Sequence, residues 1–225
     1  MIAIFHKEGR SRTRCIGVRA FLFGLALVVP GTTFAQNPPA CGVKCGKDRW
    51  TLKTLTDLDV NSVNFTTLQK KSVAQLASLP RPAKRPKLNR VAPTELQTFE
   101  VEANLTEFGT EKDRDFHIVI ADLNDPSKTM VVEIADSACQ FACASKHFAD
   151  FLDARKAFIT HCGAPATKFK RVDPPVKVTV TGVGFFDPPK HGTGAAANGI
   201  ELHPVLNISF NPDTDECKAR AKPVN

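Results

Sequence analysis

The sequence FHIVIADLNDPSKTMVVEIA, residues 116–135, carries two apolar runs separated by a turn sequence. Residues 116–123 and 130–135 are rich in Ile and Val, which favour β-strands. The residues between them, Asn124-Asp125-Pro126-Ser127, are typical of a tight turn. The stretch therefore predicts a β-hairpin, and the flanking sequence extends it in both directions.

The flanking sequence adds three strands and one helix. Residues 98–105 alternate apolar and polar side chains, which predicts a strand with one buried and one hydrated face. Residues 145–161 predict an amphipathic helix that begins at Ser145 as N-cap and ends before Gly163 and Pro165. Residues 176–186 and 200–210 are rich in Val, Ile and Leu and predict two more strands. The apolar positions of the helix are Phe148, Phe151, Leu152, Phe158, Ile159 and Cys162.

Three strands, a helix and two strands in this order predict a mainly β fold with one or two helices, built as a five-stranded OB-like barrel. An incomplete sandwich is the alternative, but an OB barrel places its single helix between the third and fourth strands, as here. Pro204 cannot donate a sheet hydrogen bond, which places it at an edge or a bulge of the last strand. Because OB barrels support many unrelated activities, this fold predicts no function by itself.

Residues 1–35 have the features of a signal peptide. Lys7 and four arginines precede the apolar run 20–29, and Thr33-Phe34-Ala35 offers a small-residue cleavage site. A retained membrane anchor is the alternative, but a spanning helix needs about twenty apolar residues. We therefore expect a secreted or periplasmic protein with no membrane span after signal removal.

The rest of the chain is predicted to comprise four parts. An N-terminal extension (36–79) contains a short helix over residues 66–79, where Ser72 and Gln75 have capping-box spacing. A basic, Pro-rich linker (80–94) separates it from the OB-like domain (95–212), and a tail (213–225) follows.

Net charge gives little support for a nucleic-acid partner. Residues 1–35 hold five of the 30 Lys and Arg and one of the 23 Asp and Glu, so the remainder carries +3 rather than +7. Prolines interleave the basic run of the linker, which favours a solvated, extended segment over a phosphate-binding one. The run consists of Arg81, Lys84, Arg85, Lys87 and Arg90.

Six cysteines follow the signal peptide. An even number in an oxidising compartment predicts three disulfides of open connectivity. Two C-x3-C pairs could also form a four-thiolate zinc site, but such sites more often use C-x2-C. The six are Cys41, Cys45, Cys139, Cys143, Cys162 and Cys217.

The predicted helix limits the pairing of Cys162. A straight helix over residues 145–161 would hold Cys143 more than about 20 Å from Cys162, too far for a disulfide. Cys162 is therefore expected to pair with Cys41, Cys45 or Cys217, unless the chain before the helix folds back and brings Cys139 alongside.

Four ionisable residues are predicted to share the outer face of neighbouring strands, because their apolar neighbours point inward. Two imidazoles and two carboxylates could bind zinc or another divalent ion. The alternative is a structural cluster of hydrogen bonds and ion pairs on the hydrated face. The four residues are His117, Glu133, Glu201 and His203.

Two loops form the second candidate site. OB barrels bind oligonucleotides or oligosaccharides with the loop between the first two strands, here 107–115, and the loop between the last two, here 187–199. Solvated turns without a function are the alternative. The candidate ligand-binding residues are Asp113, Arg114, Asp115, Asp187, Lys190 and His191.

Sequence signatures of enzymes are missing: the chain contains neither G-x-S-x-G nor H-E-x-x-H. These observations favour a non-enzymatic, extracytoplasmic binding module without a cofactor, which takes a polymer, a partner protein or a small ligand through its two loops. The alternatives are a metal-dependent hydrolase that uses the His and Glu set, and a purely structural envelope protein.

Three blocks carry a resemblance to a known group of proteins: residues 111–117, EKDRDFH; residues 181–187, TGVGFFD; and residues 198–206, NGIELHPVL. They resemble blocks shared by uncharacterised secreted bacterial proteins with an OB-like barrel. The resemblance covers the barrel region and implies secretion. Because no activity is assigned to that group, it implies no catalytic residues.

Overall fold

The computed structural model describes residues 43–189, 192–211 and 216–224, which all fall within one compact unit, Asn37–Asn225. The predicted signal peptide and Cys41 lie outside the described residues. The described chain is mainly β, with four α-helices and seven strands. In chain order, the elements are α1 (Trp50–Lys53), η1 (Val60–Ser62), β1 (Asn64–Lys70), α2 (Val73–Ala77), η2 (Thr94–Leu96), β2 (Gln97–Thr110), β3 (Phe116–Ala121), β4 (Thr129–Ile134), η3 (Ala142–Ala144), α3 (Phe148–Cys162), β5 (Lys170–Phe186), β6 (Ile200–Phe210), α4 (Glu216–Arg220) and β7 (Ala221–Pro223).

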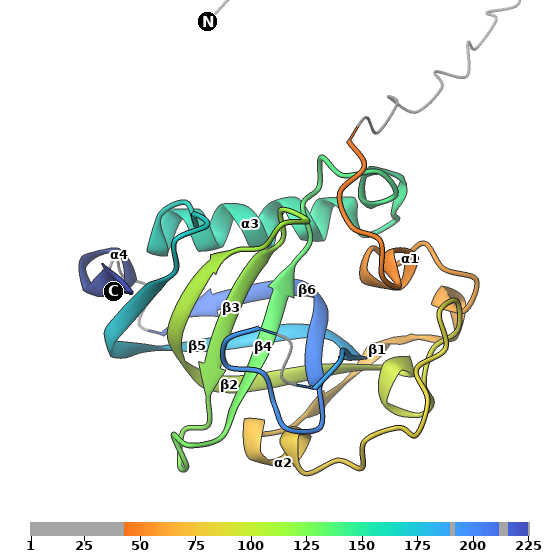
Figure 1. Cartoon of the computed structure of the whole chain (residues 1–225), viewed down its shortest axis with the longest axis horizontal. Coiled ribbons are helices and arrows are strands. Elements are labelled where there is room, and N and C mark those ends of the chain that lie inside the picture. Colours follow the sequence, from red (N-terminus) through yellow and green to blue (C-terminus); the bar gives the residue numbers. More distant parts are fainter. Residues whose placement is uncertain (1–42, 190–191, 212–215, 225) are drawn as a thin grey trace, which may run out of the picture. The chain divides into compact units, whose positions relative to one another are not determined.

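The strands form one sheet in the order β1-β2-β3-β4-β6-β5-β7. Because β2 also pairs with β5, the pairings among β2, β3, β4, β6 and β5 run in a ring (Figure 1). The ring is weakest between β4 and β6, which pair in parallel at Val131↔Glu201 and Val132↔Leu202. The predicted hairpin is confirmed as β3 and β4, which pair antiparallel along their whole length.

Two strands are longer than predicted. β2 runs to Thr110 and β5 begins at Lys170, because Glu107 and Phe108 pair with Arg171 and Lys170 beyond a register shift. The loop predicted to begin at residue 107 therefore begins at residue 111. The register between β5 and β6 shifts between the pairs Gly182↔Val205 and Gly184↔Leu202, on either side of Pro204. The irregularity predicted at Pro204 is therefore confirmed.

The predicted helices differ from the observed ones in their limits. The Ser72–Gln75 capping box is confirmed, but it opens the short helix α2, and the residues before it form β1. Pairing with β2 explains the difference, since the tertiary contact outweighs the local preference for helix. The longer helix, α3, begins at Phe148 rather than after Ser145, and Gly163 ends it as predicted.

The main core lies between the strands and α3. Alternate side chains of the strands fill it, such as Ile118, Val132 and Leu202, and Phe158 of α3 packs among them. Figure 1 shows α3 across one end of these strands. The predicted apolar face of α3 is only partly buried, because the side chains of Phe148, Leu152 and Ile159 are exposed.

A second, smaller apolar cluster joins the N-terminal segment to the ring. Trp50 and Leu55 of this segment pack with Ala135, Phe151 and Val183. Two buried ion pairs hold the segment in place.

Arg49 binds Glu95 with two contacts of 2.7 and 2.6 Å, and Arg90 binds Asp57 with two of 3.0 and 2.6 Å. The extension is therefore part of the folded unit, and the linker that follows it is anchored.

Two disulfides each join segments that are distant in sequence. Cys162 pairs with Cys217, one of the three predicted partners, and ties α3 to α4. Cys45 pairs with Cys139 and ties the N-terminal segment to the chain after β4. This bond excludes a four-thiolate zinc site that uses Cys45 and Cys139 as ligands. None of the helices in the described ranges is long and apolar enough to cross a membrane.

Candidate functional site

The four predicted outer-face residues lie together, on β3, β4 and β6. His117 is the register partner of Glu133, and Glu201 and His203 come from the neighbouring β6. The predicted hydration of this face is wrong: the exposed fractions of His117, Glu133, Glu201 and His203 are 2%, 6%, 6% and 0%. The segment that carries α1 covers this face, and the charge of its Lys53 acts on Glu133, Glu201 and His203.

His117 links the cluster to the loop between β5 and β6. Its Nε2 lies 2.9 Å from the carbonyl oxygen of Thr193, which can only accept, so Nε2 carries a proton. Its Nδ1 lies 3.0 Å from Glu133 Oε1. The loop passes so close that a Cβ on Gly192, whose φ is +87°, would lie 2.9 Å from the ring of His117. His117 is therefore held as a charged imidazolium between the loop and Glu133.

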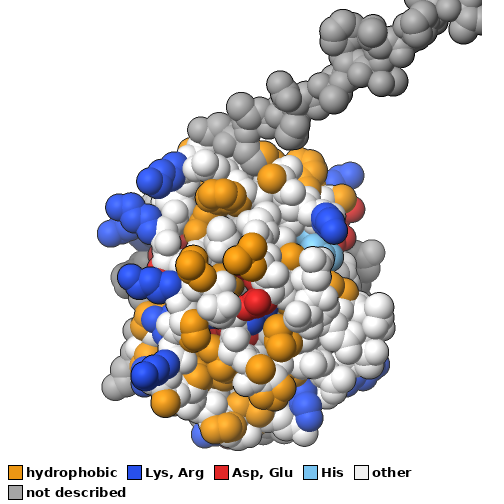
Figure 2. Space-filling model, turned by 90° about the vertical axis from the view of Figure 1, so that its right-hand side faces the viewer, with side chains coloured by type: hydrophobic (Ala, Val, Ile, Leu, Met, Phe, Trp, Pro, Cys, Tyr) orange, Lys and Arg blue, Asp and Glu red, His pale blue; other side chains and the backbone are white. Residues whose placement is uncertain are grey.

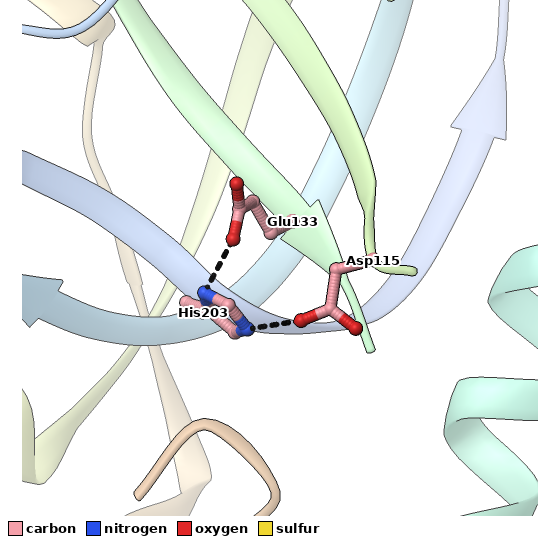
Figure 3. A group of neighbouring side chains, drawn as sticks. All are labelled: Asp115, Glu133 and His203. Carbon is pink, nitrogen blue, oxygen red and sulfur yellow. Dashed lines mark hydrogen bonds and ion pairs between the residues drawn. The ribbon is translucent and has the colours of Figure 1, made fainter. Parts of the chain in front are cut away.

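His203 lies between two carboxylates (Figure 3). Its Nε2 lies 3.2 Å from Asp115 Oδ2, with hydrogen-bond geometry. Its Nδ1 lies 2.9 Å from Glu133 Oε2, which is an ion-pair distance, but this atom has no hydrogen-bond partner. His203 thus has one buried nitrogen that faces a carboxylate without a directed bond to it.

Lys53 supplies a third positive charge. Its Nζ lies 3.9 Å from Glu133 Oε2 and 5.6 Å from the centre of the Phe185 ring. The cluster therefore combines the carboxyl groups of Asp115, Glu133 and Glu201 with two imidazoles and one ammonium, all shielded from water.

Burial and the neighbouring charges shift the pKa values of the three acids in different directions. Burial raises the pKa of Glu201 to about 7, and raises that of Asp115 to about 6 despite the hydrogen bond from His203. Burial also acts to raise the pKa of Glu133, but the positive charges around it hold that pKa well below its usual range. Glu133 is thus the ionised centre of the cluster.

The pKa values of the bases all rise. Burial lowers the pKa of each base, and the charge of Lys53 lowers that of His203 further, but the surrounding hydrogen bonds and negative charges together raise all three pKa values, with Glu133 as the strongest single contributor. His203 also gains from its hydrogen bond to Asp115. The cluster therefore stabilises the charged forms of the three bases around Glu133.

A pocket of about 540 Å³ opens onto the cluster. Glu133 and Lys53 line it together with residues 45–47 of the N-terminal segment and residues 111–113 of the β2–β3 loop. A small molecule or an ion can therefore reach Glu133 from the surface.

The structure brings together two sets of residues that the sequence suggested separately. Asp115, predicted as a loop ligand, belongs to the cluster, and Asp113 lines the pocket. The charge of Asp187 acts on Lys53 and Glu201 from the other loop. Arg114 binds Asp136 at 2.7 Å instead of a carboxylate of the cluster. The other two candidates, Lys190 and His191, lie outside the described residues.

Sequence reasoning missed Lys53 and assigned Asp115 to the loop set instead of the outer-face set. Asp115 precedes His117 by two residues, just before β3, and this spacing could have placed it on the same face. Lys53 carries no such signal, because the segment that holds it is distant in sequence from the strands.

Three of these residues have the arrangement of metal ligands. One ligand atom each from Asp115, Glu133 and His203 lies within 4.8 Å of the other two, in the one such group found among the described residues. An imidazole with two carboxylates suits zinc and other divalent transition ions.

The basic linker run is partly engaged in ion pairs. Arg90 is buried against Asp57, and Arg85 lies 3.5 Å from Asp187. Arg81, Lys84 and Lys87 remain exposed, so three of the five basic side chains of this run face solvent.

A scan against protein-family models, a search of curated proteins and a search of solved structures each found no match. The resemblance to secreted bacterial proteins therefore stays a prediction, and function is inferred below from the residues and their geometry.

Proposed function

We propose that this protein is an extracytoplasmic domain that binds one divalent metal ion, with zinc as the first choice, through Asp115, Glu133 and His203. The observation that carries the proposal is the convergence of these three buried side chains, whose ligand atoms lie within 4.8 Å of one another. The buried His203 Nδ1 lies 2.9 Å from Glu133 Oε2 without hydrogen-bond geometry, so an ion between these two groups would replace an ion pair and no directed hydrogen bond.

The ion would replace protons in the cluster. A metal-binding imidazole must be neutral, so His203 has to release its extra proton when the ion binds. Glu133 is already ionised and can accept the ion without such a change. We therefore expect the affinity for zinc to increase as the pH rises.

Metal-dependent hydrolysis is the activity that the pocket favours. Catalytic zinc sites have three protein ligands and an open position for water, and the ion supplies a polarised water or hydroxide. Glu133 faces a pocket of about 540 Å³, which gives a substrate access to that position. Lys53, on the same pocket wall, would bind a negatively charged group of the substrate.

The OB-like architecture and the extracytoplasmic location belong to the same proposal. The ring of pairings from β2 through β3, β4, β6 and β5 has the strand order of an OB barrel. Both predicted loops reach the cluster, one through residues 111–113 and the other through Thr193. The two disulfides support an oxidising compartment.

Metal analysis of the folded protein tests this proposal. The chain is treated with a chelator, incubated with zinc, dialysed, and measured for bound metal and for binding heat. We expect one zinc per chain in the unchanged protein and none in His203→Ala or Glu133→Gln. His161→Ala is the matched control, because it removes an imidazole that stacks on Phe210 away from the cluster.

Circular dichroism must show that each variant is folded. The proposal is wrong if the folded, unchanged protein binds no zinc, or if the cluster variants retain it like His161→Ala. Loss of zinc in the cluster variants alone supports it.

A further inference from the structure

A second pocket, of about 550 Å³, shares residues 45–47 with the pocket above Glu133 but contains none of the three proposed metal ligands. Residues 44–51 and 87–88 line it, together with Gln140 and Phe141. A volume of this size suits a small organic molecule.

The walls of this pocket are fixed to each other. The disulfide Cys45–Cys139 joins the two segments, and Gln140 donates its backbone N–H to the carbonyl oxygen of Val43 at 2.6 Å. The indole Nε1 of Trp50 donates to the carbonyl oxygen of Gln140 at 2.8 Å. A ligand would therefore meet a pocket that is already formed, which lowers the entropic cost of binding.

Exposed apolar side chains line this pocket. Phe141 and Leu88 are 42% and 68% exposed, which is unusual for large apolar residues beside a rigid cavity. Phe141 also has a φ of +73°, an unfavourable backbone angle for a bulky side chain. The structure thus holds the Phe141 ring at the pocket surface although the backbone conformation of this residue is energetically unfavourable.

Four cations line the same pocket, of which Arg49 is buried in its ion pair with Glu95. Lys44, Lys47 and Lys87 are exposed, and none of them forms an ion pair with another described residue. The single acid, Asp48, lies 3.7 Å from Arg85. Figure 2, which turns α1 and the 80–94 segment toward the viewer, shows lysine and arginine side chains along one margin of this face, beside exposed hydrophobic ones.

We infer that this pocket binds an amphipathic organic anion, in which an aromatic or alicyclic body carries one carboxylate, sulfonate or phosphate. The exposed Phe141 ring and Leu88 side chain would contact the body, and the three lysines would bind the charged group. This site is separate from the proposed metal site and does not depend on it.

Titration with the fluorescent aromatic sulfonate 1-anilinonaphthalene-8-sulfonate tests the inference, in the presence of a chelator so that metal binding plays no part. We expect saturable binding to one site that weakens at high salt. Leu88→Ser should weaken it, and so should the double variant Lys47→Ala/Lys87→Ala, by about tenfold for the pair of lysines.

Matched controls distinguish binding in this pocket from nonspecific binding elsewhere on the protein surface. Leu152→Ser removes an exposed leucine on α3, and Lys156→Ala/Lys168→Ala removes two exposed lysines elsewhere, so both should bind the probe unchanged. The uncharged analogue N-phenyl-1-naphthylamine should bind at least about tenfold more weakly. Equal binding of the neutral analogue, equal losses in the controls, or no saturable binding would each overturn the inference.

Discussion

The two faces of β3, β4 and β6 are equally buried but chemically opposite. On the inner face, Ile118 and Val132 pack in the main core. On the outer face, the neighbouring His117 and Glu133 are as inaccessible to water as the core residues, yet both ionise. The inner face needs only apolar side chains that fit, whereas each outer-face group needs a charged partner.

This contrast is consistent with the proposed metal-binding role of the outer face. A buried ion-pair cluster contributes less to folding than apolar side chains of the same volume often would. Each face also has its own disulfide: Cys162–Cys217 beside the main core and Cys45–Cys139 in the cover of the outer face. The two faces can therefore be perturbed separately.

The largest effect is expected in the inner core. Phe158 is fully buried, with its ring centre 5.1 Å from that of Phe108, so Phe158→Ala should lower the free energy of unfolding by about 3–5 kcal/mol. Urea denaturation at acidic and alkaline pH should give the same loss. Phe148→Ala, on the exposed side of α3, is the control and should cost much less. Equal costs for both variants would contradict the assignment of the core.

Removing each of the two disulfides should affect the two faces differently. Removing either pair with serine substitutions should cost about 2–4 kcal/mol, since each closes a long loop. Only Cys45→Ser/Cys139→Ser should also weaken the pH dependence of stability, because it loosens the cover of the outer face and admits water. Urea denaturation of both double variants at several pH values measures this. A weaker pH dependence after Cys162→Ser/Cys217→Ser instead would reverse the roles of the two bonds.

The metal-free protein should lose stability as the pH rises from 5 to 8, by about 1–3 kcal/mol. The pKa of Glu201 is raised from 4.5 to about 7, so the folded state binds this proton more tightly and stability falls across that range. The raised pKa values of His117 and His203 extend the fall above pH 6.5. The lowered pKa of Glu133 costs stability only below pH 4.5.

Chemical denaturation in a chelator measures this profile. Glu201→Gln should reduce the fall between pH 5 and 7, and the part that remains near pH 5 to 6 comes from Asp115, whose pKa is raised to about 6. Phe158→Ala should shift the profile downward without changing its shape. A flat or rising profile in the unchanged protein would mean that the outer-face groups are not buried as described.

The smallest effect concerns Lys53 and rests on the proposed metal site. Its ammonium repels a cation bound at Glu133, so Lys53→Met should raise the affinity for zinc about tenfold. Calorimetric titration measures it, with Lys112→Met at the exposed rim of the pocket as control. Unchanged or weaker zinc binding in Lys53→Met would show that Lys53 does not compete with the ion.

Local patterns predicted much of the fold. Runs rich in Ile, Val and Leu located β3, β4 and β6, alternation located β2, and the capping-box spacing of Ser72 and Gln75 located the start of α2. The same rules failed for β1, which was predicted as helix, because its parallel pairing with β2 depends on a distant segment. They also failed for Phe148, Leu152 and Ile159, whose helical spacing does not reveal which side faces the core.

The sequence by itself determined which side chains share the outer face, because the two-residue period of a strand places His117, Glu133, Glu201 and His203 on one side once the strands are known. It also determined that Cys162 could not pair with Cys143 across a straight helix. Only the tertiary structure decided that this face is buried, that Lys53 supplies its counter-charge and that Asp115 joins His203. The reason is physical: a strand pattern is local, whereas burial and the pKa values that follow from it depend on which distant segment covers the face.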